Sequence, residues 1–415
     1  MAGTVIIGAG QGGYQVAASL REHKYQASIT LVGDEGLLPY QRPPLSKAYL
    51  LGEMDGERLL LRPQAFYETR NIDLILDDAA TAIDRAAGRV TLASGKTLAY
   101  DHLVLALGAR NRKLPIAGAA LDGVFYLRTR AESDAIHQRI LDARSIAVIG
   151  AGFIGLELAA VASKLGKRVT VVEALGRAMS RAVSQPISDF FARAHAGWGV
   201  ELLFNARLQE IVEAGGRVAG LVLADRSRLG ADLVLVGIGI EPNVELAAAA
   251  GLETNNGIVV DAQMATSDPH ISAIGDCAAF PDPVSGARIR LESVQNAVDQ
   301  ARCVAKRITG EPETYAAVPW FWSDQRDLKL QMVGLTAGCD RTVLRGDPAN
   351  RAFSVFCFRG ETLLGIESVN RAADHMFGRR LLAAGESITP DEAVDPGFDL
   401  KARLAKIPAP ARAAG

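Results

Sequence analysis

The chain has 415 residues, of which 49% are hydrophobic and 22% charged, and its formal net charge is −2. This length predicts two or three domains, and this composition is typical of a globular protein. The charge excludes a globally basic nucleic-acid binder but leaves room for a local basic patch facing an acidic partner. No apolar run reaches the roughly 18–20 residues that span a bilayer, and residues 1–3 lead straight into a strand-like run. We therefore expect a cytoplasmic protein without a membrane segment.

Cysteine and histidine spacing argues against metal or dithiol chemistry. The four cysteines are far apart and form no C-x-x-C pair, and the six histidines are scattered. This pattern argues against a zinc site and against a thioredoxin-like dithiol. The cysteines are Cys277, Cys303, Cys339 and Cys357.

The first 34 residues have a strand, glycine turn, helix and strand pattern. An apolar run at residues 5–7 precedes Gly-Ala-Gly-Gln-Gly-Gly at 8–13, which also includes Gly12. A helical stretch follows to about His23, and a second strand at 28–32 ends at Asp34. The same pattern returns at 145–149, 150–155 and 168–172, ending at Glu173. An internal repeat of a whole nucleotide-binding unit implies two such domains.

Both copies have the context that makes a G-x-G-x-x-G match specific for dinucleotides. The first glycine permits a tight turn, the second lets the backbone approach a pyrophosphate, and the third allows close packing of helix on strand. These positions are Gly8, Gly10 and Gly13 in the first copy and Gly150, Gly152 and Gly155 in the second. The helix N-terminus then offers N–H groups to phosphates, while Asp34 and Glu173 would accept hydrogen bonds from ribose hydroxyls.

The rest of the chain predicts a return to the first domain and then a third domain. Strand-plus-glycine segments at 102–108 and 231–239 extend the two sheets, and 258–276 with a helix at 294–308 rejoins the first domain. After Pro319, short β-rich runs and two short helical stretches favour an α+β domain. We expect dinucleotide-binding domains over 1–111 plus 243–318 and over 112–242, a C-terminal domain over 319–405 and a disordered tail over 406–415.

Two dinucleotides in one chain suggest a bound flavin beside an exchanging nicotinamide, between which hydride passes. The stretch Leu-Pro-Tyr-Gln-Arg-Pro-Pro-Leu-Ser-Lys at 38–47 resembles the NADH-dependent ferredoxin reductases of oxygenase systems, and apoptosis-inducing factor carries a similar stretch. Further matching motifs lie at 126–129, 150–157, 273–276, 292–296 and 321–324. The resemblance spans about residues 1–400. It implies an α/β fold with two Rossmann-like domains in a glutathione-reductase-like arrangement, plus the α+β C-terminal domain.

The resemblance also implies cofactors, a partner and site residues. FAD would remain bound, NADH would be the substrate, and a 2Fe–2S ferredoxin serving a cytochrome P-450 or ring-hydroxylating oxygenase would take electrons singly. The implied FAD residues are Gly8, Gly10, Gly12, Gly13, Asp34, Arg42, Lys47, Ala80, Arg128, Asp276, Val294 and Trp322. The implied NADH residues are Gly150, Gly152, Gly155, Glu173 and Gly239. A Lys47–Glu157 pair would lie beside the flavin where nicotinamide docks.

Simpler interpretations stay open for single residues. Lys47 could be a surface cation, Glu157 a favourable first-turn carboxylate, and Trp322 an ordinary core residue. Glu173 would repel the 2′-phosphate of NADPH and so favour NADH. Arg177 and Arg181, further along the chain, could reduce this preference or contact the pyrophosphate. Docking of an acidic ferredoxin would need a basic patch. Candidates are Arg302 and Lys306 with the adjacent Arg307, and also Lys329, Arg379 and Arg380.

Two rival functions also remain. One is an NADH oxidase or quinone-type reductase, and the other is an FAD protein of the apoptosis-inducing-factor kind, used mainly for interaction. Because no cysteine precedes Cys277, a redox-active thiol in the first domain is not available, which favours the ferredoxin reductase.

Overall fold

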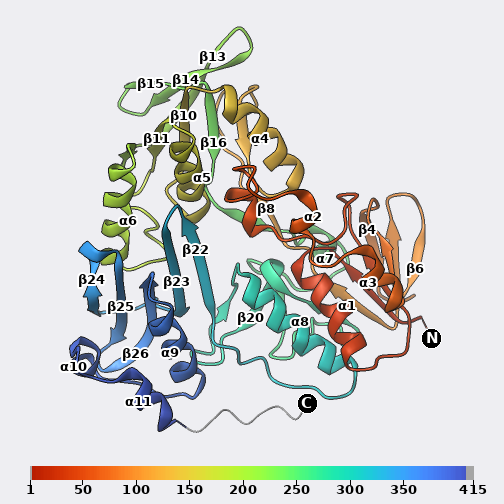
Figure 1. Cartoon of the computed structure of the whole chain (residues 1–415). Coiled ribbons are helices and arrows are strands. Elements are labelled where there is room, and N and C mark those ends of the chain that lie inside the picture. Colours follow the sequence, from red (N-terminus) through yellow and green to blue (C-terminus); the bar gives the residue numbers. More distant parts are fainter. Residues whose placement is uncertain (1, 408–415) are drawn as a thin grey trace. The chain divides into compact units, whose positions relative to one another are not determined.

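The computed structural model describes residues 2–407, which form two compact units (Figure 1). Unit 1 contains the described residues of Met1–Arg42, Asp55–Arg110 and Ile240–Ala317. Unit 2 contains those of Pro43–Met54, Asn111–Gly239 and Val318–Gly415. The domain limits expected from the sequence stay predictions. The segment Pro43–Met54, which carries Lys47, packs with unit 2.

Unit 1 is built on a five-stranded parallel sheet, ordered β19-β7-β1-β2-β3. Its strands are Ile271–Ala273, His102–Leu105, Thr4–Ile7, Ile29–Val32 and Ile72–Ile75. These runs are almost continuously apolar, as expected for parallel strands covered on both faces. Helices α1 (Gln11–Glu22) and α8 (Val294–Ile308) pack against each other (Figure 1). The expected return of the chain to its first sheet is therefore observed, because β19 pairs with β7.

Smaller elements of unit 1 surround this sheet. A three-stranded antiparallel sheet contains β4 (Ala80–Asp84), β5 (Arg89–Leu92) and β6 (Thr97–Ala99). Another sheet has the order β18-β20-β21, with strands Ile258–Val259, Ala278–Pro281 and Arg288–Ile289. Short helices lie at α2 (Gly56–Leu59), α3 (Gln64–Thr69), α7 (Glu245–Ala249) and η2 (Gly275–Cys277). Strands β8 (Ala109–Asn111) and β17 (Ile240–Pro242) pair with each other.

Unit 2 repeats the nucleotide-binding architecture. Its parallel sheet is ordered β12-β11-β10-β16-β9. The strands are Val200–Leu203, Arg168–Val172, Ser145–Ile149, Leu233–Val236 and Val124–Tyr126. Helices of this part are η1 (Pro43–Ser46), α4 (Arg130–Asp142), α5 (Phe153–Lys164) and α6 (Gln185–Gly197). A three-stranded sheet of β13 (Leu208–Ala214), β14 (Arg217–Leu223) and β15 (Arg228–Gly230) extends it.

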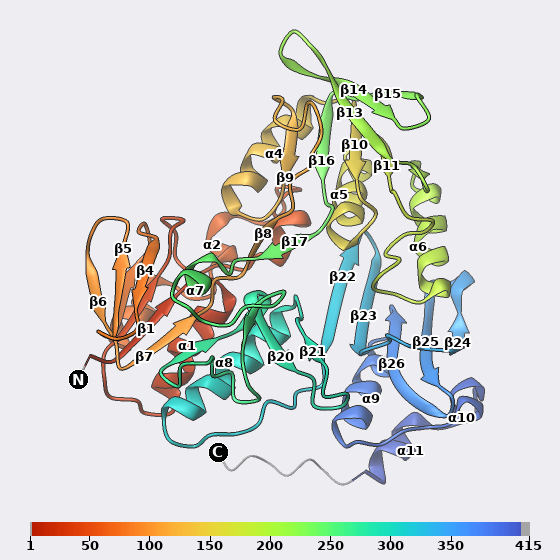
Figure 2. The ribbon, with the colours of Figure 1, turned by 180° about the vertical axis from the view of Figure 1, so that it is seen from behind.

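The C-terminal part of unit 2 is a five-stranded antiparallel sheet, ordered β22-β23-β26-β25-β24 (Figure 2). Its strands are Trp320–Gln325, Leu328–Gly334, Thr362–Val369, Ala352–Arg359 and Arg341–Asp347, with η3 at Pro348–Asn350. Helix α9 (Ala372–Ala383) packs on β23 and β26. This is the α+β arrangement expected after Pro319.

The residues after the C-terminal sheet form one more helix than the sequence predicted. Up to Ile407, three helices follow the sheet rather than two, because α10 (Pro390–Val394) and α11 (Leu400–Ala405) follow the longer α9. Each short helix has its own side-chain cap, from Thr389 and Asp399 respectively. Lys406 and Ile407 close α11 by backbone hydrogen bonds. The remainder of the expected disordered tail, residues 408–415, lies outside the described residues.

Candidate active site

Both glycine turns have the backbone geometry that a dinucleotide site needs. The φ angle is +110° at Gly8 and +99° at Gly150, a region that L side chains rarely adopt. A Cβ atom at Gly13 would lie 1.9 Å from the Gly8 carbonyl oxygen, and one at Gly155 would lie 2.0 Å from the Gly150 carbonyl oxygen. Only glycine therefore lets each helix approach the turn before it.

Open space and free donors lie at the start of both helices. A Cβ built on Gly10 meets no heavy atom within 4 Å, and one on Gly152 first meets the Gly237 oxygen at 3.9 Å. Among the described residues, no side chain caps either helix at these glycines, and no acidic residue occupies either first turn. A helix N-terminus in this state offers N–H groups and partial positive charge to an anion. The residues of each turn thus fit a dinucleotide pyrophosphate.

Gly12 serves the packing behind the first turn. A Cβ at this position would lie 3.1 Å from the Ile274 Cδ1 atom and 3.8 Å from the Ala297 Cβ atom. Gly12 therefore lets α1 approach both α8 and the segment that leads into Asp276. The glycine acts on the candidate FAD site through packing of these elements.

Two acidic residues follow β2, and the sequence analysis singled out only one. Asp34 is exposed at the position expected for ribose binding. The next residue, Glu35, accepts a hydrogen bond from Tyr40 Oη at 2.5 Å and forms an ion pair with Arg42. Glu35 is therefore a second candidate for the ribose and fixes Arg42 near it. A second carboxylate directly after Asp34 was the available signal.

The other candidate FAD residues of unit 1 lie on well-defined elements. Asp276 lies in η2, where its carbonyl oxygen accepts a hydrogen bond from Arg290 at 3.0 Å. Val294 is the first residue of α8, which the Ser293 hydroxyl caps. Ala80 begins β4 and pairs with Leu92. Strand β19 leads to Asp276, and it belongs to the same parallel sheet as the glycine turn's β1.

The candidate NADH site lies wholly in unit 2. Glu173 follows β11, and its carboxylate accepts backbone N–H groups of Ala151 at 2.7 Å and of Leu175 at 2.8 Å. The acid is thereby held against the glycine turn, with acceptor capacity left for ribose hydroxyls. Gly239 has a φ of +107°, and its carbonyl oxygen accepts the Arg112 N–H at 3.0 Å.

Arg177 is engaged in its own loop. Its guanidinium donates to the Val183 carbonyl at 3.0 Å and to the Ser180 carbonyl at 2.7 Å. These bonds hold the loop after Glu173 closed. Arg181 is exposed in the same loop. Arg177 could therefore contact a coenzyme phosphate only by giving up these bonds.

Lys47 and Glu157 form a buried ion pair in unit 2. The distance from Lys47 Nζ to Glu157 Oε2 is 2.8 Å, and their side chains are 18% and 2% exposed. The same Oε2 atom accepts the Ser46 hydroxyl, and Oε1 accepts the Ser323 hydroxyl at 2.6 Å. The interpretation of Glu157 as a first-turn carboxylate is wrong, because α5 begins at Phe153 and Glu157 is its fifth residue. A buried charge of this kind needs such partners.

Trp322 and Arg128 complete the candidate FAD residues in unit 2. Trp322 lies on β22, and its ring centroid is 5.6 Å from that of Trp320. Arg379 lies over the Trp320 ring, 4.6 Å from its centroid. Arg128 precedes α4, and its backbone N–H donates to Glu132 Oε2 at 2.7 Å, within the cap of that helix.

The predicted site residues therefore divide between the units. The candidate FAD residues of unit 1 are Gly8, Gly10, Gly12, Gly13, Asp34, Arg42, Ala80, Asp276 and Val294. Those of unit 2 are Lys47, Arg128 and Trp322. All candidate NADH residues and Glu157 belong to unit 2. Sequence reasoning missed Ser46, Ser323 and Glu35, whose roles depend on contacts made by the folded chain.

The four cysteines are free thiols, and three of them are buried. Burial raises the pKa of Cys277 and of Cys303 to about 11, so neither is a thiolate near neutral pH. Within residues 2–407, no group of three or more His, Cys, Asp or Glu could hold a metal ion. Over the same residues, no helix combines the length and apolar character that a membrane crossing requires.

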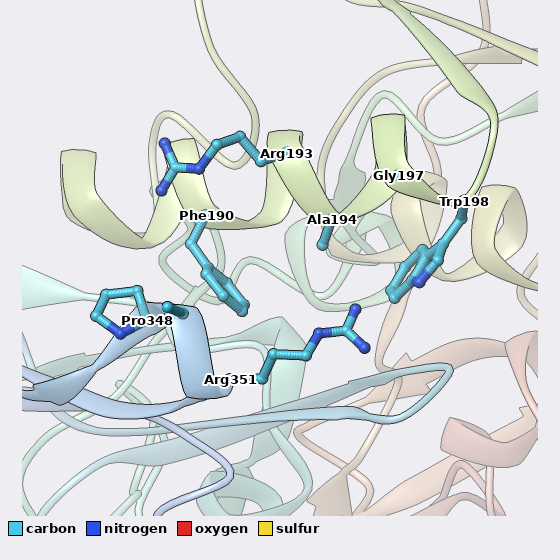
Figure 3. A pocket seen from close by; sticks show the side chains of 8 residues that line it. Phe190, Arg193, Ala194, Gly197, Trp198, Pro348 and Arg351 are labelled. Atoms are coloured by element: carbon cyan, nitrogen blue, oxygen red, sulfur yellow. The ribbon is translucent and has the colours of Figure 1, made fainter.

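A cavity of about 620 Å³ lies in unit 2 (Figure 3). Helix α6 and Trp198 form one wall, and the segment around Pro348 and Arg351 forms the other. Arg351 lies over the Trp198 ring and pairs with Asp327. The cavity contains none of the predicted site residues.

This geometry defines a class of protein, an oxidoreductase that binds two dinucleotides, and comparison with known proteins agrees. The family model of the pyridine nucleotide-disulphide oxidoreductases matches residues 3–301, and that of the reductase C-terminal domain matches 320–404. The chain belongs to the pyridine nucleotide-disulphide oxidoreductase family and carries the reductase C-terminal domain. The predicted fold class is thereby confirmed.

Relatives with known names match almost the whole chain. Rhodocoxin reductase from Rhodococcus erythropolis is 52% identical over 97% of this chain and 94% of its own length. The ferredoxin reductase for the CYP199A2 system from Rhodopseudomonas palustris has a similar structure, with a TM-score of 0.96, 53% identity and coverage of 97% and 100%. A covalent putidaredoxin reductase–putidaredoxin complex matches with a TM-score of 0.95, 39% identity and coverage of 98% and 99%. The resemblance to ferredoxin reductases is confirmed.

Proposed function

We propose that this chain is an NADH-dependent, FAD-containing ferredoxin reductase that delivers electrons to a 2Fe–2S ferredoxin serving an oxygenase. The observation that carries the proposal is the pair of open, uncapped glycine turns in one chain whose full-length relatives are named as ferredoxin reductases. Two turns provide for two dinucleotides. When bound, FAD supplies the conversion between a two-electron donor and a one-electron acceptor.

The chain's own residues bind and orient the two dinucleotides. The N–H groups at the start of α1 would hold one pyrophosphate, and those at the start of α5 would hold the other. Glu173, fixed by Ala151 and Leu175, would accept the ribose hydroxyls of NADH. Lys47 and Glu157 would place an ammonium and a carboxylate next to the flavin and nicotinamide. Their burial supports this role, because a buried pair in a solvent-poor site keeps a fixed geometry.

Thiol chemistry has no place in the proposal. The first cysteine is Cys277, which is buried and has a pKa raised to about 11 by that burial. A cysteine in that state is a poor nucleophile and a poor electron relay. We include a cytoplasmic location in the proposal, because four unpaired cysteines are characteristic of a reducing compartment.

Steady-state reduction of cytochrome c tests the function against its rivals. The purified protein should contain FAD, and NADH-driven reduction of cytochrome c should depend on an added 2Fe–2S ferredoxin. Rapid NADH consumption by oxygen or quinone without ferredoxin would instead favour the NADH oxidase. Bound FAD without turnover in any assay would favour an interaction protein. Release of FMN, or of no flavin, would exclude the proposal.

A further inference from the structure

Strand β22 packs against helix α5 in unit 2, and two of its odd-numbered side chains contact that helix. Phe321 packs on Phe153 with ring centroids 4.6 Å apart, and Ser323 reaches Glu157. Two residues of strand rise about 6.6 Å, and four residues of helix rise about 6 Å. Phe321 and Ser323, two residues apart on the strand, therefore meet successive turns of the helix, at Phe153 and Glu157.

The next residue of this series, Gln325, reaches helix α6. Its Oε1 atom lies 2.8 Å from His195 Nε2, and its Nε2 donates to the Ser323 hydroxyl oxygen at 3.2 Å. Ser323, Gln325 and His195 are all 0% exposed. A continuous line of hydrogen bonds thus connects His195 with the Lys47–Glu157 pair, and no water has access to it from bulk solvent.

The direction of every hydrogen bond in this line follows from its two ends. The Glu157 carboxylate can only accept, so the Ser323 hydroxyl must donate to it. The Ser323 oxygen is then free to accept the Gln325 NH₂, which turns the Gln325 carbonyl oxygen toward His195. His195 must therefore carry its proton on Nε2. Its Nδ1 atom has no partner among the described residues, as expected for the unprotonated nitrogen.

The opposite arrangement would leave donors and acceptors mismatched. If the Gln325 amide were reversed, Ser323 would face acceptors on both sides with a single proton to donate. His195 would then meet the amide NH₂ and would have to accept at Nε2. Burial lowers the pKa of His195 to about 4, so the ring is neutral near pH 7 and has one proton to place.

We propose that Ser323, Gln325 and His195 are positioning residues for the reductase reaction, forming a one-way donor chain that fixes the Glu157 carboxylate and thereby the Lys47 ammonium. The inference rests on the role given to Lys47 and Glu157 in the proposed function. His195 sets the Gln325 amide, Gln325 sets the Ser323 hydroxyl, and Ser323 holds Glu157 Oε1. Lys47 and Ser46 hold the other oxygen.

Variants that break the hydrogen-bond chain should slow flavin reduction but leave coenzyme binding nearly unchanged. In stopped-flow experiments on the FAD-loaded protein, Ser323→Ala should lower the limiting rate of flavin reduction by NADH about tenfold, because a hydrogen bond to a charged group is lost. Gln325→Leu should lower it about threefold to fivefold, as a neutral bond is lost. The dissociation constant of NAD⁺, measured by calorimetry, should change less than about twofold, since the uniform binding contacts are intact.

Epistasis and rescue separate positioning from general damage. Because Gln325 acts through Ser323, the Ser323→Ala/Gln325→Leu double variant should be no slower than Ser323→Ala alone. Ser323→Thr, which keeps the hydroxyl, should restore most of the rate. The matched control is Ser354→Ala, which removes another fully buried serine that donates to a carboxylate, Asp374 Oδ2, at 2.8 Å. That variant should keep the wild-type reduction rate.

A measurement without activity tests the direction of the chain in the wild-type protein. With ¹⁵N-labelled histidine, the holoprotein should show His195 as the Nε2–H tautomer near pH 7, and the signal should be identified by its loss in His195→Gln. An Nδ1–H tautomer would overturn the inference even if the Ser323 and Gln325 variants failed to fold.

The outcomes also separate this inference from the proposed function. Slow flavin reduction in Lys47→Met with normal flavin reduction in Ser323→Ala would overturn the role of the hydrogen-bond chain but leave the proposed reductase function standing. Normal reduction in both variants would overturn the role of the ion pair and the chain together. If the variants and the His195 tautomer behave as predicted but the protein does not reduce a ferredoxin, only the proposed partner would be rejected.

Discussion

At the scale of single residues, the two glycine motifs show which parts of a motif are chemical and which are structural. A Cβ at Gly13 would collide with the Gly8 carbonyl oxygen at 1.9 Å, whereas one at Gly10 would enter open space. The spacing of the motif is readable from sequence because backbone sterics dictate it. The Lys47–Glu157 pair was implied by the family resemblance alone, and the Ser323 contact of Glu157 is not readable from spacing, because Ser323 lies 166 residues further along the chain. Contacts of that kind exist only after β22 has packed on α5.

The contrast between these two glycines predicts different failures. Gly10→Ala should leave the thermal midpoint of the flavin-free protein nearly unchanged but lower its FAD content, because the new methyl occupies the space left for a pyrophosphate. Gly13→Ala should destabilise unit 1 by about 1–3 kcal/mol through overpacking against backbone. Flavin absorbance measures the FAD content, and thermal unfolding after flavin removal measures the stability of each variant. Equal FAD content in Gly10→Ala and the wild type would contradict the assignment of this turn.

Glu173 should set the coenzyme preference. It is fixed beside the second glycine turn and would repel the 2′-phosphate of NADPH, so kcat/KM should favour NADH by about tenfold or more, equivalent to roughly 1.4 kcal/mol or more. Arg177 is hydrogen-bonded to the carbonyls of Val183 and Ser180, so it could bind a 2′-phosphate directly only by giving up those bonds. Glu173→Ser should reduce the ratio mainly by slowing turnover with NADH. Equal kcat/KM values for the two coenzymes in the wild type would refute the assignment.

His195 should make stability depend on pH. Burial lowers its pKa in the folded protein to about 4, from the ordinary histidine value of 6.5. Between these values the unfolded chain binds a proton that the folded chain refuses, so the free energy of unfolding falls as pH drops from 6.5 toward 4. The loss between pH 7 and 4.5 is about 2–3 kcal/mol at most. Urea unfolding of His195→Gln should show a smaller decrease over this interval, and an equal decrease would contradict the buried neutral ring.

At the scale of elements, long periodic segments were predictable and short exposed ones were not. Helix α8 runs over Val294–Ile308, the same limits that the sequence predicted, because its buried residues recur with helical spacing after the Ser293 cap. The small antiparallel sheets β4-β5-β6 and β13-β14-β15 were not anticipated. Strands β4 and β13 are largely exposed, so their hydrophobic alternation is weak, although β5 and β14 do alternate exposed and buried residues. Helices α10 and α11 have five and six residues, so neither is long enough to show a clear helical repeat of buried residues.

The elements that carry the cysteines give a further prediction. Cys277 lies in η2, Cys303 in α8, Cys357 in β25, and Cys339 in a turn. All four cysteines can be replaced together, the three buried ones by alanine and Cys339 by serine. NADH-to-ferricyanide turnover should stay within about twofold of the wild type, since no thiol takes part in the chemistry. Flavin absorbance serves as the folding control, because Cys277 follows Asp276 directly. Full flavin occupancy with lost flavin reduction would show that a thiol is required.

At the scale of the whole molecule, a net charge of −2 makes recognition of an acidic partner a local matter. The sequence suggested the face of α8 with Arg302 and Lys306. The structure shows that Arg302 pairs with Asp299 at 3.2 Å and Lys306 with Glu313 at 2.5 Å. Arg307 turns inward and donates to the Pro269 carbonyl at 2.9 Å. These contacts leave the face nearly neutral. The Asp299–Arg302 pair has the i,i+3 spacing that counting along the helix reveals, whereas the Lys306–Glu313 contact and the inward turn of Arg307 depend on the fold.

Charge reversal on this face decides whether it docks the ferredoxin. Arg302→Glu/Lys306→Glu would leave Asp299 and Glu313 unpaired and make the face strongly acidic. If the partner docks here, ferredoxin reduction should slow about tenfold at low salt, and the difference should shrink at high salt as screening increases. NADH-to-ferricyanide turnover should be unchanged.

The matched control, Arg226→Glu/Arg228→Glu, makes the same change in net charge at exposed residues near β15, so it should have a small effect. An unchanged ferredoxin rate would exclude α8 and direct the search to Lys329, Arg379 and Arg380, of which Arg379 already lies over Trp320.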